Sequence, residues 1–353
     1  MTLLNWHNKG HKGGEYPLFL GDDLGVMDTV NVTYPQLEEL YQTQLSQIWN
    51  EFEVDISQDK LDMHNVDEGV VDLMRKTIMW QTVGDTLASR SILECLGGVT
   101  TNPELLNLET IWGFFEVIHA RTYSHIIKQT VDNPQELMEE VYASKELKDR
   151  TKLLIKLFNR MRVSSDESWC TRTATLKEHI LETLTGLLAL ESISFMSSFA
   201  VTFAIAETGV FQGIAQLVKL VCRDELLHAK MGYTILEILK NEEEWDEAFK
   251  ATQTKRTDIV SKVVESEKSW ATYLFSEGRE VVGLNEEMLH KYVDHMSEPA
   301  YSTCGIHAKG SKSPLPYMDK WVDSSKIQTA AQELQITSYT VGEIEDDTDG
   351  LEF

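Results

Sequence analysis

Two short motifs in this chain each place a histidine three residues after a glutamate: Glu116 with His119, and Glu225 with His228. Residues at this spacing share one face of an α-helix, because a turn takes about 3.6 residues. Two such helices, with one carboxylate from each of two more, build a di-metal site in a helix bundle. Carboxylate oxygens and imidazole nitrogens suit Fe(II) and Mn(II), whereas structural zinc sites favour cysteine.

Two other acidic residues are candidates for the remaining carboxylates. Glu191 lies in the apolar sequence LLALESISFMSSFA, where a charged group needs a partner. Asp85 lies in MWQTVGDTLASR, and an aspartate inside a helix is more often a cap or a surface residue. From the residues alone, its candidacy depends on the need for a fourth carboxylate. Tyr123 follows His119 by one helical turn, so a phenol would stand beside two redox metals.

Other histidines are interpreted as structural or surface residues. Glu287 and His290 repeat the same spacing, but their neighbours Glu286, Lys291, Asp294 and His295 indicate a more solvated helix face, so this motif is interpreted as a surface pair. His125 lies six residues after His119 and therefore off its face.

The composition excludes several classes of function. The chain has 353 residues, 42% of them hydrophobic, and a formal charge of −25, so neither nucleic acid nor an anionic membrane surface is an expected partner. Its four cysteines are widely spaced without a CxxC motif, which indicates reduced thiols in a cytoplasmic protein. The N-terminus shows no signal-peptide pattern.

One apolar stretch, residues 186–206, is long enough to span a bilayer. It contains Glu191, and a carboxylate in that position is costly unless it is paired or bound to a metal. We therefore interpret this stretch as a core helix that carries a ligand.

The organisation of the chain is predicted to be all-α, a ferritin-like bundle of long helices. No proline occurs between Pro134 and Pro299, and Asn102-Pro103 and Asn133-Pro134 are typical helix starts. Helical apolar spacing covers residues 67–97, 104–130, 150–162, 172–205, 209–241 and 246–275.

Three regions are expected along the chain: an irregular arm at residues 1–35, a helical domain at 36–320 and a flexible acidic tail at 321–353. The tail ends in apolar Leu351 and Phe353. From its composition it is either a solvated end or a peptide that docks in a groove of a partner.

Four stretches match a known family in their order and spacing: WQTVGDTLASRS at 80–91, FFEVIHARTYSHII at 114–127, LESISFMSSFA at 190–200 and CRDELLHAKMG at 222–232. With them the chain resembles the small, radical-generating subunit of class I ribonucleotide reductase, most closely the class Ia type of bacteria and phages. The resemblance extends from about Trp49 to Phe353.

This resemblance implies six ligands for two iron ions, with manganese as the alternative. It assigns Asp85, Glu116 and His119 to the first metal, and Glu191, Glu225 and His228 to the second.

The resemblance also implies a radical and a surrounding apolar pocket. Tyr123 matches the tyrosine that such proteins oxidise with O2 to a stable radical. Phe195, Phe199 and Val221 match the pocket that shields this radical, although ordinary core packing would explain the two phenylalanines equally well.

A route for the radical is implied in the same way. Trp49 matches the relay tryptophan of the family, and Asp224 the aspartate that links it to His119. Tyr339 and Glu333 match residues of the tail that pass the radical to a partner. Without the resemblance, Trp49 would be interpreted as a core aromatic and Tyr339 as an ordinary tail residue.

The partner implied is the large, catalytic subunit, which binds the tail, and a homodimer of the chain is expected. The holoenzyme would reduce ribonucleoside diphosphates to their 2′-deoxy forms. The chain itself has no phosphate-binding glycine loop and no thiol pair for that step. Two alternatives remain open: another di-metal oxidase on the same bundle, such as a hydroxylase or desaturase, and an iron-storage protein.

Overall fold

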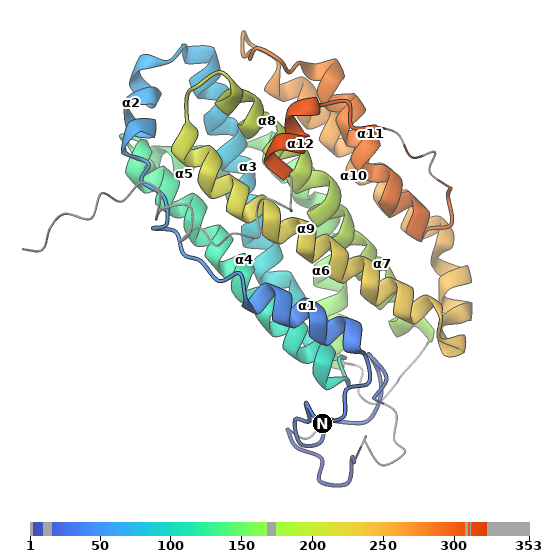
Figure 1. Ribbon diagram of the computed structural model, residues 1–353. Helices are drawn as coiled ribbons and strands as arrows, with labels where there is room; N and C mark the ends of the chain where they lie inside the picture. Colours follow the sequence, from blue (N-terminus) through green and yellow to red (C-terminus); the bar gives the residue numbers. More distant parts are fainter. Residues whose placement is uncertain (1–2, 10–15, 168–173, 308–309, 311, 323–353) are drawn as a thin grey trace, which may run out of the picture. The chain divides into compact units, whose positions relative to one another are not determined.

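Helices provide the regular structure of the chain in a computed structural model that describes residues 3–9, 16–167, 174–307, 310 and 312–322 (Figure 1). Among these residues no strand forms, and only two isolated bridges occur, so the all-α prediction is confirmed. The α-helices are α1 (Pro35–Leu45), α2 (Ser57–Asn65), α3 (Glu68–Ile92), α4 (Pro103–Thr130), α5 (Pro134–Ala143), α6 (Lys145–Glu167), α7 (Ala174–Ala189), α8 (Met196–Glu207), α9 (Gln212–Lys240), α10 (Asp246–Leu274), α11 (Glu286–Thr303) and α12 (Pro316–Val322).

Three shorter turns join or extend these helices. The turn η2 (Leu93–Gly97) continues α3 as a π-helix, and η3 (Leu190–Phe195) is a π-helix between α7 and α8. A 3₁₀ turn, η4 (Glu243–Trp245), precedes α10. Each segment with helical apolar spacing forms a helix over most of its described residues, whereas the spacing gave no sign of α1, α2, α5, α11 or α12. The start of α5 was indicated by Asn133-Pro134 instead. Pro299 lies inside α11 rather than beyond the helical region.

Asparagine caps fix the starts of the helices that the sequence marked with an Asn-Pro pair. The side chain of Asn102 accepts a hydrogen bond from the backbone N–H of Leu105 at 2.8 Å, with Pro103 at the first position of α4. Asn133 accepts from the backbone N–H of Glu136 at 3.3 Å, ahead of α5. Such caps satisfy N–H groups that have no partner inside the helix.

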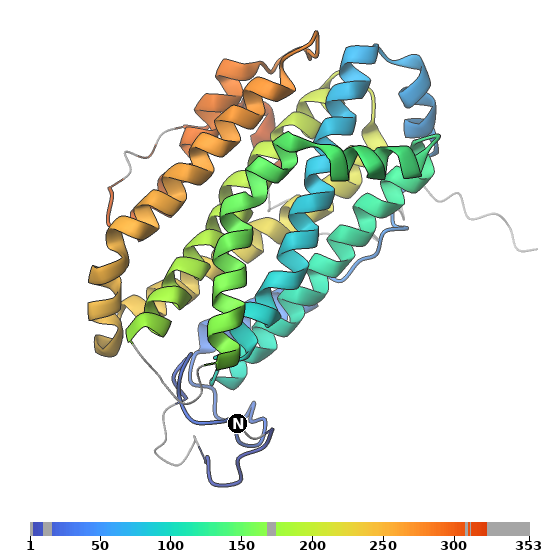
Figure 2. The same ribbon diagram turned by 180° about the vertical axis from the view of Figure 1, so that it is seen from behind.

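Helices α3, α4 and α9 and the turn η3 pack against one another in the interior of the helical part of the structure. α3 packs along α4, and α9 contacts α4, α7, α8 and η3. On the opposite side, α6 lies between α3 and α10, as Figure 2 shows. Side chains of α3, α4, η3 and α9 therefore meet in one interior region.

The arm before α1 contains no helix in its described residues 3–9 and 16–34. It is tied to the chain ahead of α4 by backbone hydrogen bonds from Leu20 to Val99 and from Thr101 to Leu18, both 2.9 Å. The predicted division into arm, helical domain and tail stays a prediction, and residues 323–353 lie outside the described chain.

The continuous helix from Ala174 to Glu207 is long and apolar enough to cross a membrane, and it was the only such helix found among the described residues. Its most apolar window is completely buried against the other helices. This burial is what a core helix of a soluble protein shows, in agreement with the interpretation of residues 186–206.

Gly84 on α3 allows η3 to approach closely. A Cβ atom at this position would lie 2.7 Å from Cε1 of Phe195, which is closer than a side-chain carbon can come. The glycine therefore brings the Phe195 ring directly against the α3 backbone, one residue before Asp85.

We predict that Gly84→Ala lowers the free energy of unfolding by about 1–3 kcal/mol, because the new methyl group overpacks this contact. The matched control is Gly113→Ala on α4, where the nearest atom to the new Cβ would be Leu93 Cδ1 at 3.7 Å. Chemical denaturation measures both variants. Equal stability of the two would contradict the steric role of Gly84.

Candidate metal centre

Six acidic and histidine side chains from four elements converge in the interior. Asp85 comes from α3, Glu116 and His119 from α4, Glu191 from the π-helical turn η3, and Glu225 and His228 from α9. All six are fully buried. A π-helical turn shifts the direction of side chains relative to an α-helix, and such turns are frequent at functional sites. Glu191 lies in the first turn of η3.

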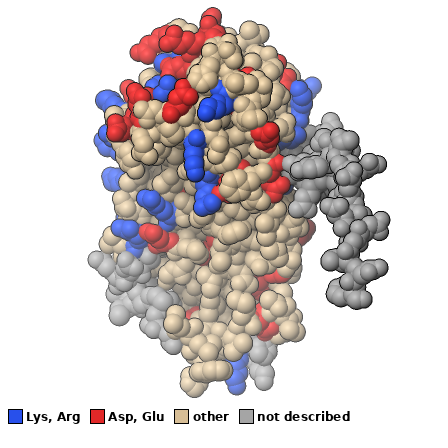
Figure 3. Space-filling view, turned by 90° about the vertical axis from the view of Figure 1, so that its left-hand side faces the viewer, with Lys and Arg blue, Asp and Glu red and all other residues tan. Residues whose placement is uncertain are grey.

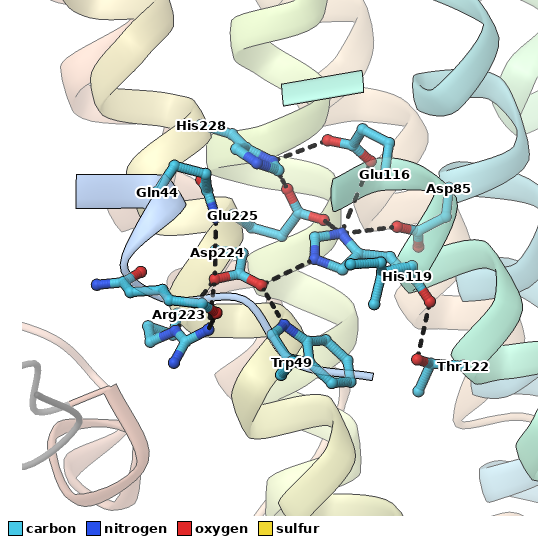
Figure 4. A network of polar contacts seen from close by, with 12 residues as sticks. Gln44, Trp49, Asp85, Glu116, His119, Thr122, Arg223, Asp224, Glu225 and His228 are labelled. Carbon is cyan, nitrogen blue, oxygen red and sulfur yellow. Dashed lines mark hydrogen bonds and ion pairs between the residues drawn. The ribbon is translucent and has the colours of Figure 1, made fainter. Parts of the chain in front are cut away.

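The two histidines each face carboxylates of two different helices. Nδ1 of His119 lies 3.0 Å from Oε1 of Glu225 and 3.4 Å from Oδ1 of Asp85. Nδ1 of His228 lies 2.8 Å from an oxygen of Glu116 and 2.8 Å from an oxygen of Glu225. Figure 4 shows Glu225 between the two imidazoles, with Asp85 on the far side of His119.

Ligand atoms of four of these residues, Glu116, His119, Glu225 and His228, all lie within 4.8 Å of one another. Such a group can hold a metal ion, and Asp85 and Glu191 add two carboxylates at its edge.

Polar atoms without a hydrogen-bond partner gather at this centre. They are Oδ1 and Oδ2 of Asp85, Oε2 of Glu116, Nδ1 of His119, both carboxylate oxygens of Glu191, Oε1 of Glu225 and Nε2 of His228. Buried polar atoms are almost always satisfied, so such a concentration of unsatisfied ones needs an explanation. Four carboxylates and two imidazoles fit two divalent cations, whose charge would offset that of the four carboxylates. The residues present therefore fit a di-metal centre.

Electrostatics at the centre lead to the same conclusion. Burial raises the pKa of Asp85 to about 7 and that of Glu225 to about 8, and it holds the pKa of Glu191 well above its ordinary value. Burial also opposes the ionisation of Glu116, but the charges of His228 and His119 outweigh it and lower that pKa to about 2. Without added cations, the four carboxylates are therefore not all ionised at neutral pH.

Asp224 contacts the other ring nitrogen of His119, the one that faces away from the candidate ligands. Oδ2 of Asp224 lies 3.1 Å from Nε2 of His119 and accepts a hydrogen bond of 2.7 Å from the indole N–H of Trp49. Such a partner orients a ligand histidine and fixes which nitrogen faces the metal. The contacts expected between Trp49, Asp224 and His119 are thus present.

Arg223 and Gln44 complete the surroundings of Asp224. Arg223 donates two hydrogen bonds to Oδ1 of Asp224, at 3.0 and 2.9 Å, and Gln44 donates one at 3.4 Å. Burial would raise the pKa of Asp224, but the hydrogen bond with His119 and the charge of Arg223 lower it overall. Asp224 is therefore held ionised, beside both an imidazole and an indole.

The sequence analysis did not identify Trp112 as a site residue, although its position four residues before Glu116 places it on the same helix face. Trp112 lies one turn before Glu116, to which its indole N–H donates at 3.0 Å. Its ring lies 5.4 Å from that of His228, so it restrains two of the candidate ligands. Gln44 and Arg223 were also missed, and Gln44 had no local signal because its contact spans 180 residues.

Tyr123 lies beside the centre, completely buried, and its hydroxyl has no hydrogen-bond partner within the described part of the chain. Burial, together with the nearby charges of Asp85 and Glu225, holds its pKa well above the ordinary value, so the phenol stays protonated. Phe195, Phe199 and Val221 are fully buried as well. The two phenylalanine rings stack with centroids 6.0 Å apart and an interplanar angle of 9°.

The other polar residues considered from the sequence lie elsewhere. Glu287 pairs with Lys291 at 2.7 Å, and Nε2 of His290 lies 2.9 Å from the carbonyl oxygen of Lys268, so this motif is a surface pair. His125 packs edge-on against Phe52.

The prediction of reduced thiols agrees with the structure: the three cysteines among the described residues, Cys95, Cys222 and Cys304, are free and buried. Tyr339 and Glu333 lie outside the described residues.

Comparison with known proteins identifies the family. The family model described as "Ribonucleotide reductase, small chain" matches residues 26–309. The ribonucleoside-diphosphate reductase subunit beta of Haemophilus influenzae is 30% identical over 356 residues, which cover 96% of this chain and 94% of that protein.

Solved structures share the fold. The ribonucleotide reductase R2 subunit from Clostridium botulinum superposes with a TM-score of 0.78 at 23% identity, covering 91% of this chain and 98% of that one. An R2-like ligand-binding oxidase with a Mn/Fe cofactor gives a TM-score of 0.60 at 18% identity, covering 77% and 94%. The predicted ferritin-like fold with a carboxylate–histidine cluster is thereby confirmed.

The raised pKa values predict how the stability of the metal-free protein depends on pH. Folded Asp85 keeps a proton up to about pH 7, whereas the unfolded side chain loses it near pH 4. The folded state therefore binds more protons in this window, and its stability falls as the pH rises. Relative to Asp85→Asn, which cannot titrate, the wild type should lose about 1–4 kcal/mol of unfolding free energy between about pH 5 and 8.

Denaturation of both proteins at several pH values measures this difference. Mn(II) must displace the same proton, so its stabilising effect on the wild type should grow with pH. A difference between the two proteins that does not change with pH would contradict the assignment of the raised pKa to Asp85.

Proposed function

Since the chain belongs to the family of ribonucleotide reductase small chains, we propose how its own residues generate a radical and pass it to a partner. The chain is the small, radical-generating subunit of a ribonucleoside-diphosphate reductase, an oxidoreductase. The residue assignments depend mainly on one observation, the group of buried polar atoms without partners among the described residues. The buried phenol of Tyr123 is near this group, and His119, one of its members, contacts Asp224 and through it Trp49.

In this proposal the six convergent residues hold two metal ions. Asp85, Glu116 and His119 hold one ion, and Glu191, Glu225 and His228 hold the other. We propose iron, with manganese as the alternative, because oxygen and imidazole ligands suit both. When bound, the two ions supply the activation of O2 and the one-electron oxidation of a neighbouring phenol.

Tyr123 is the residue that we propose to carry the radical. A phenol oxidised at neutral pH must give up its proton together with the electron, because its pKa is held above the ordinary value. Among the charged neighbours that raise the pKa of this phenol, Asp85 has the largest effect. Phe195, Phe199 and Val221 surround the site with groups that neither donate hydrogen bonds nor give up electrons easily.

Trp49 and Asp224 form the first part of the outward route in this proposal. The indole N–H of Trp49 donates to Asp224, so Asp224 can accept the proton when Trp49 loses an electron. Arg223 keeps Asp224 ionised and therefore ready to accept it. Tyr339 and Glu333 would continue the route from the tail to the large subunit.

The family supports a proposal for the partners and the location of the chain. Small subunits of ribonucleotide reductase work with a large subunit and generally form dimers. We propose that residues 321–353 dock in a groove of the large subunit, that the chain forms a homodimer and that it acts in the cytoplasm.

For the dimer we propose the face of α4 that bears exposed Phe114 and Val117, 50% and 47% exposed, beside Leu93 of η2. Figure 3, which faces the side of α4 and α5, shows charged side chains crowded on the upper part of this side and few below. Exposed apolar side chains that lie close together are typical of a protein interface.

A di-metal oxidase that acts alone is the alternative, since the same fold occurs in the R2-like ligand-binding oxidase. The Trp49–Asp224–His119 chain favours the reductase subunit, because an oxidase that acts alone needs no outward route for a radical. Iron storage is not supported by the family.

Tyr123→Phe tests the radical site. We expect the variant to bind the same number of metal ions but to form no radical and support no turnover with the large subunit. Because the Tyr123 hydroxyl has no partner, the unfolding free energy should change by less than about 1 kcal/mol. Metal analysis, electron paramagnetic resonance (EPR) and a reductase assay measure the three properties. Retained turnover would exclude the tyrosyl mechanism.

Deletion of residues 334–353 tests the docking tail. We expect the radical of the truncated protein to be unchanged and its binding to the large subunit to be lost. The matched control is Tyr339→Phe, which should bind the large subunit normally but support no turnover, because it cannot carry the radical. Unchanged affinity of the truncated protein would show that the tail is only a solvated end.

A further inference from the structure

Buried tryptophans near the metal centre differ in what their indole N–H groups contact. The N–H of Trp49 donates to Asp224 at 2.7 Å, and that of Trp112 donates to Glu116 at 3.0 Å. Trp80 on α3 is completely buried, and its N–H has no hydrogen-bond partner in the described part of the chain. Two indoles therefore have a carboxylate that can accept a proton, and the third has none.

A positive charge lies on the face of Trp80. The guanidinium carbon of Arg150, from α6, is 3.5 Å from the centroid of the Trp80 ring and 4.8 Å from that of Trp270 on α10. Burial lowers the pKa of Arg150 to about 10, so the guanidinium keeps its charge at neutral pH. A cation is attracted to the electron-rich face of a neutral indole.

Glu267 of α10 holds Arg150 in this position. Nε of Arg150 donates to Oε1 of Glu267 at 2.9 Å, and Nη2 forms a second contact with Oε2. Both side chains are almost completely buried. They line a cavity of about 320 Å³ between α6 and α10 that also reaches Ser194 of η3. The ion pair therefore separates Trp80 from this cavity.

Trp80 is close to the oxidising centre. It lies one helical turn before Gly84, and Cζ2 of Trp80 is 3.6 Å from the position of a Cβ atom on Gly84. That position is in contact with Phe195, which lines the proposed pocket of the radical, and Asp85 is the next residue along α3. An indole is readily oxidised, so Trp80 is a competing electron donor at this centre.

We propose that the Arg150–Glu267 pair prevents the oxidation of Trp80 and thereby confines the radical to Tyr123 and Trp49. The proposal rests on the proposed function, which supplies the one-electron oxidant. The step that it blocks is the loss of one electron from Trp80, which would leave a Trp80 radical cation. The electron would reduce the oxidised centre, or it would reduce the Tyr123 radical as that phenol takes back the proton that it gave up on oxidation.

Two features of the structure oppose this step. A radical cation on Trp80 would place a positive charge 3.5 Å from that of Arg150, which turns the attraction into repulsion. The radical cation would also need to release its N–H proton to become neutral, and no acceptor from the described residues is within hydrogen-bond distance. Trp49 is the contrasting case, since Asp224 is both its proton acceptor and a negative charge beside it.

The test replaces Arg150 and Glu267 with uncharged side chains of similar volume. The variant Arg150→Met/Glu267→Gln is compared with Arg150→Gln/Glu267→Gln, which keeps hydrogen-bonding groups across the same gap. Arg150→Lys retains the positive charge. An exposed pair on α10 that does not line this cavity serves as the matched control, Lys250→Met/Glu247→Gln. Thermal unfolding of the metal-free proteins selects the variants that fold.

Each folded protein is loaded with Fe(II) and exposed to air. Peptide mass spectrometry then measures oxidised Trp80, and EPR follows the lifetime of the tyrosyl radical. We expect at least about tenfold more oxidised Trp80 in the two charge-free variants, because Arg150 lies 3.5 Å from the ring centroid, and a charge–charge interaction at this distance exceeds that factor even after the Glu267 carboxylate offsets part of it. The radical should decay faster in both. Arg150→Lys and the control pair should resemble the wild type.

Adding Trp80→Phe to the charge-free variants should restore the lifetime of the radical, since phenylalanine is hard to oxidise. The proposal is wrong if a folded charge-free variant forms the radical and accumulates no more oxidised Trp80 than the wild type. A wild-type protein that forms no radical would contradict the proposed function instead, so the two failures are distinct.

Discussion

The burial of four carboxylates and two imidazoles in an apolar interior is the constraint on which the rest of this structure depends. Among the described residues, eight polar atoms of these six side chains have no hydrogen-bond partner, and the pKa of Asp85 rises to about 7. An uncompensated charge in such a place is costly, whereas two divalent cations compensate it. The long helices α3, α4 and α9, and the π-helical turn η3, hold these groups together. Stability and chemistry therefore depend on the same residues.

Asp224 connects the candidate metal centre to Trp49. It contacts His119 on one side and Trp49 on the other, and Arg223 holds it ionised. One carboxylate thus orients a candidate metal ligand and serves as a proton acceptor for an indole. Trp80 shows the opposite arrangement, because a guanidinium lies on its ring and its N–H has no acceptor among the residues that the structure describes. The same type of side chain is thereby favoured for oxidation at one position and protected at another.

Local sequence patterns predicted the parts of the site that depend on helix periodicity. The spacing of Glu116 and His119 required only one helix, and the apolar surroundings of Glu191 indicated a buried charge. Asp85 could be assigned only with the family resemblance. Gln44 and Arg150 could not be predicted, because their partners lie more than 100 residues away and no local pattern encodes such contacts. The π-helical turn at Glu191 also left no sign in the apolar spacing.

The most direct test of this account is anomalous X-ray diffraction from crystals loaded with Fe(II) or Mn(II). We predict two metal peaks in each chain, one bound by Asp85, Glu116 and His119 and the other by Glu191, Glu225 and His228. Such peaks would explain why these buried atoms have no other partners. A single peak, or peaks outside these six residues, would contradict the di-metal centre and with it the proposed source of the radical.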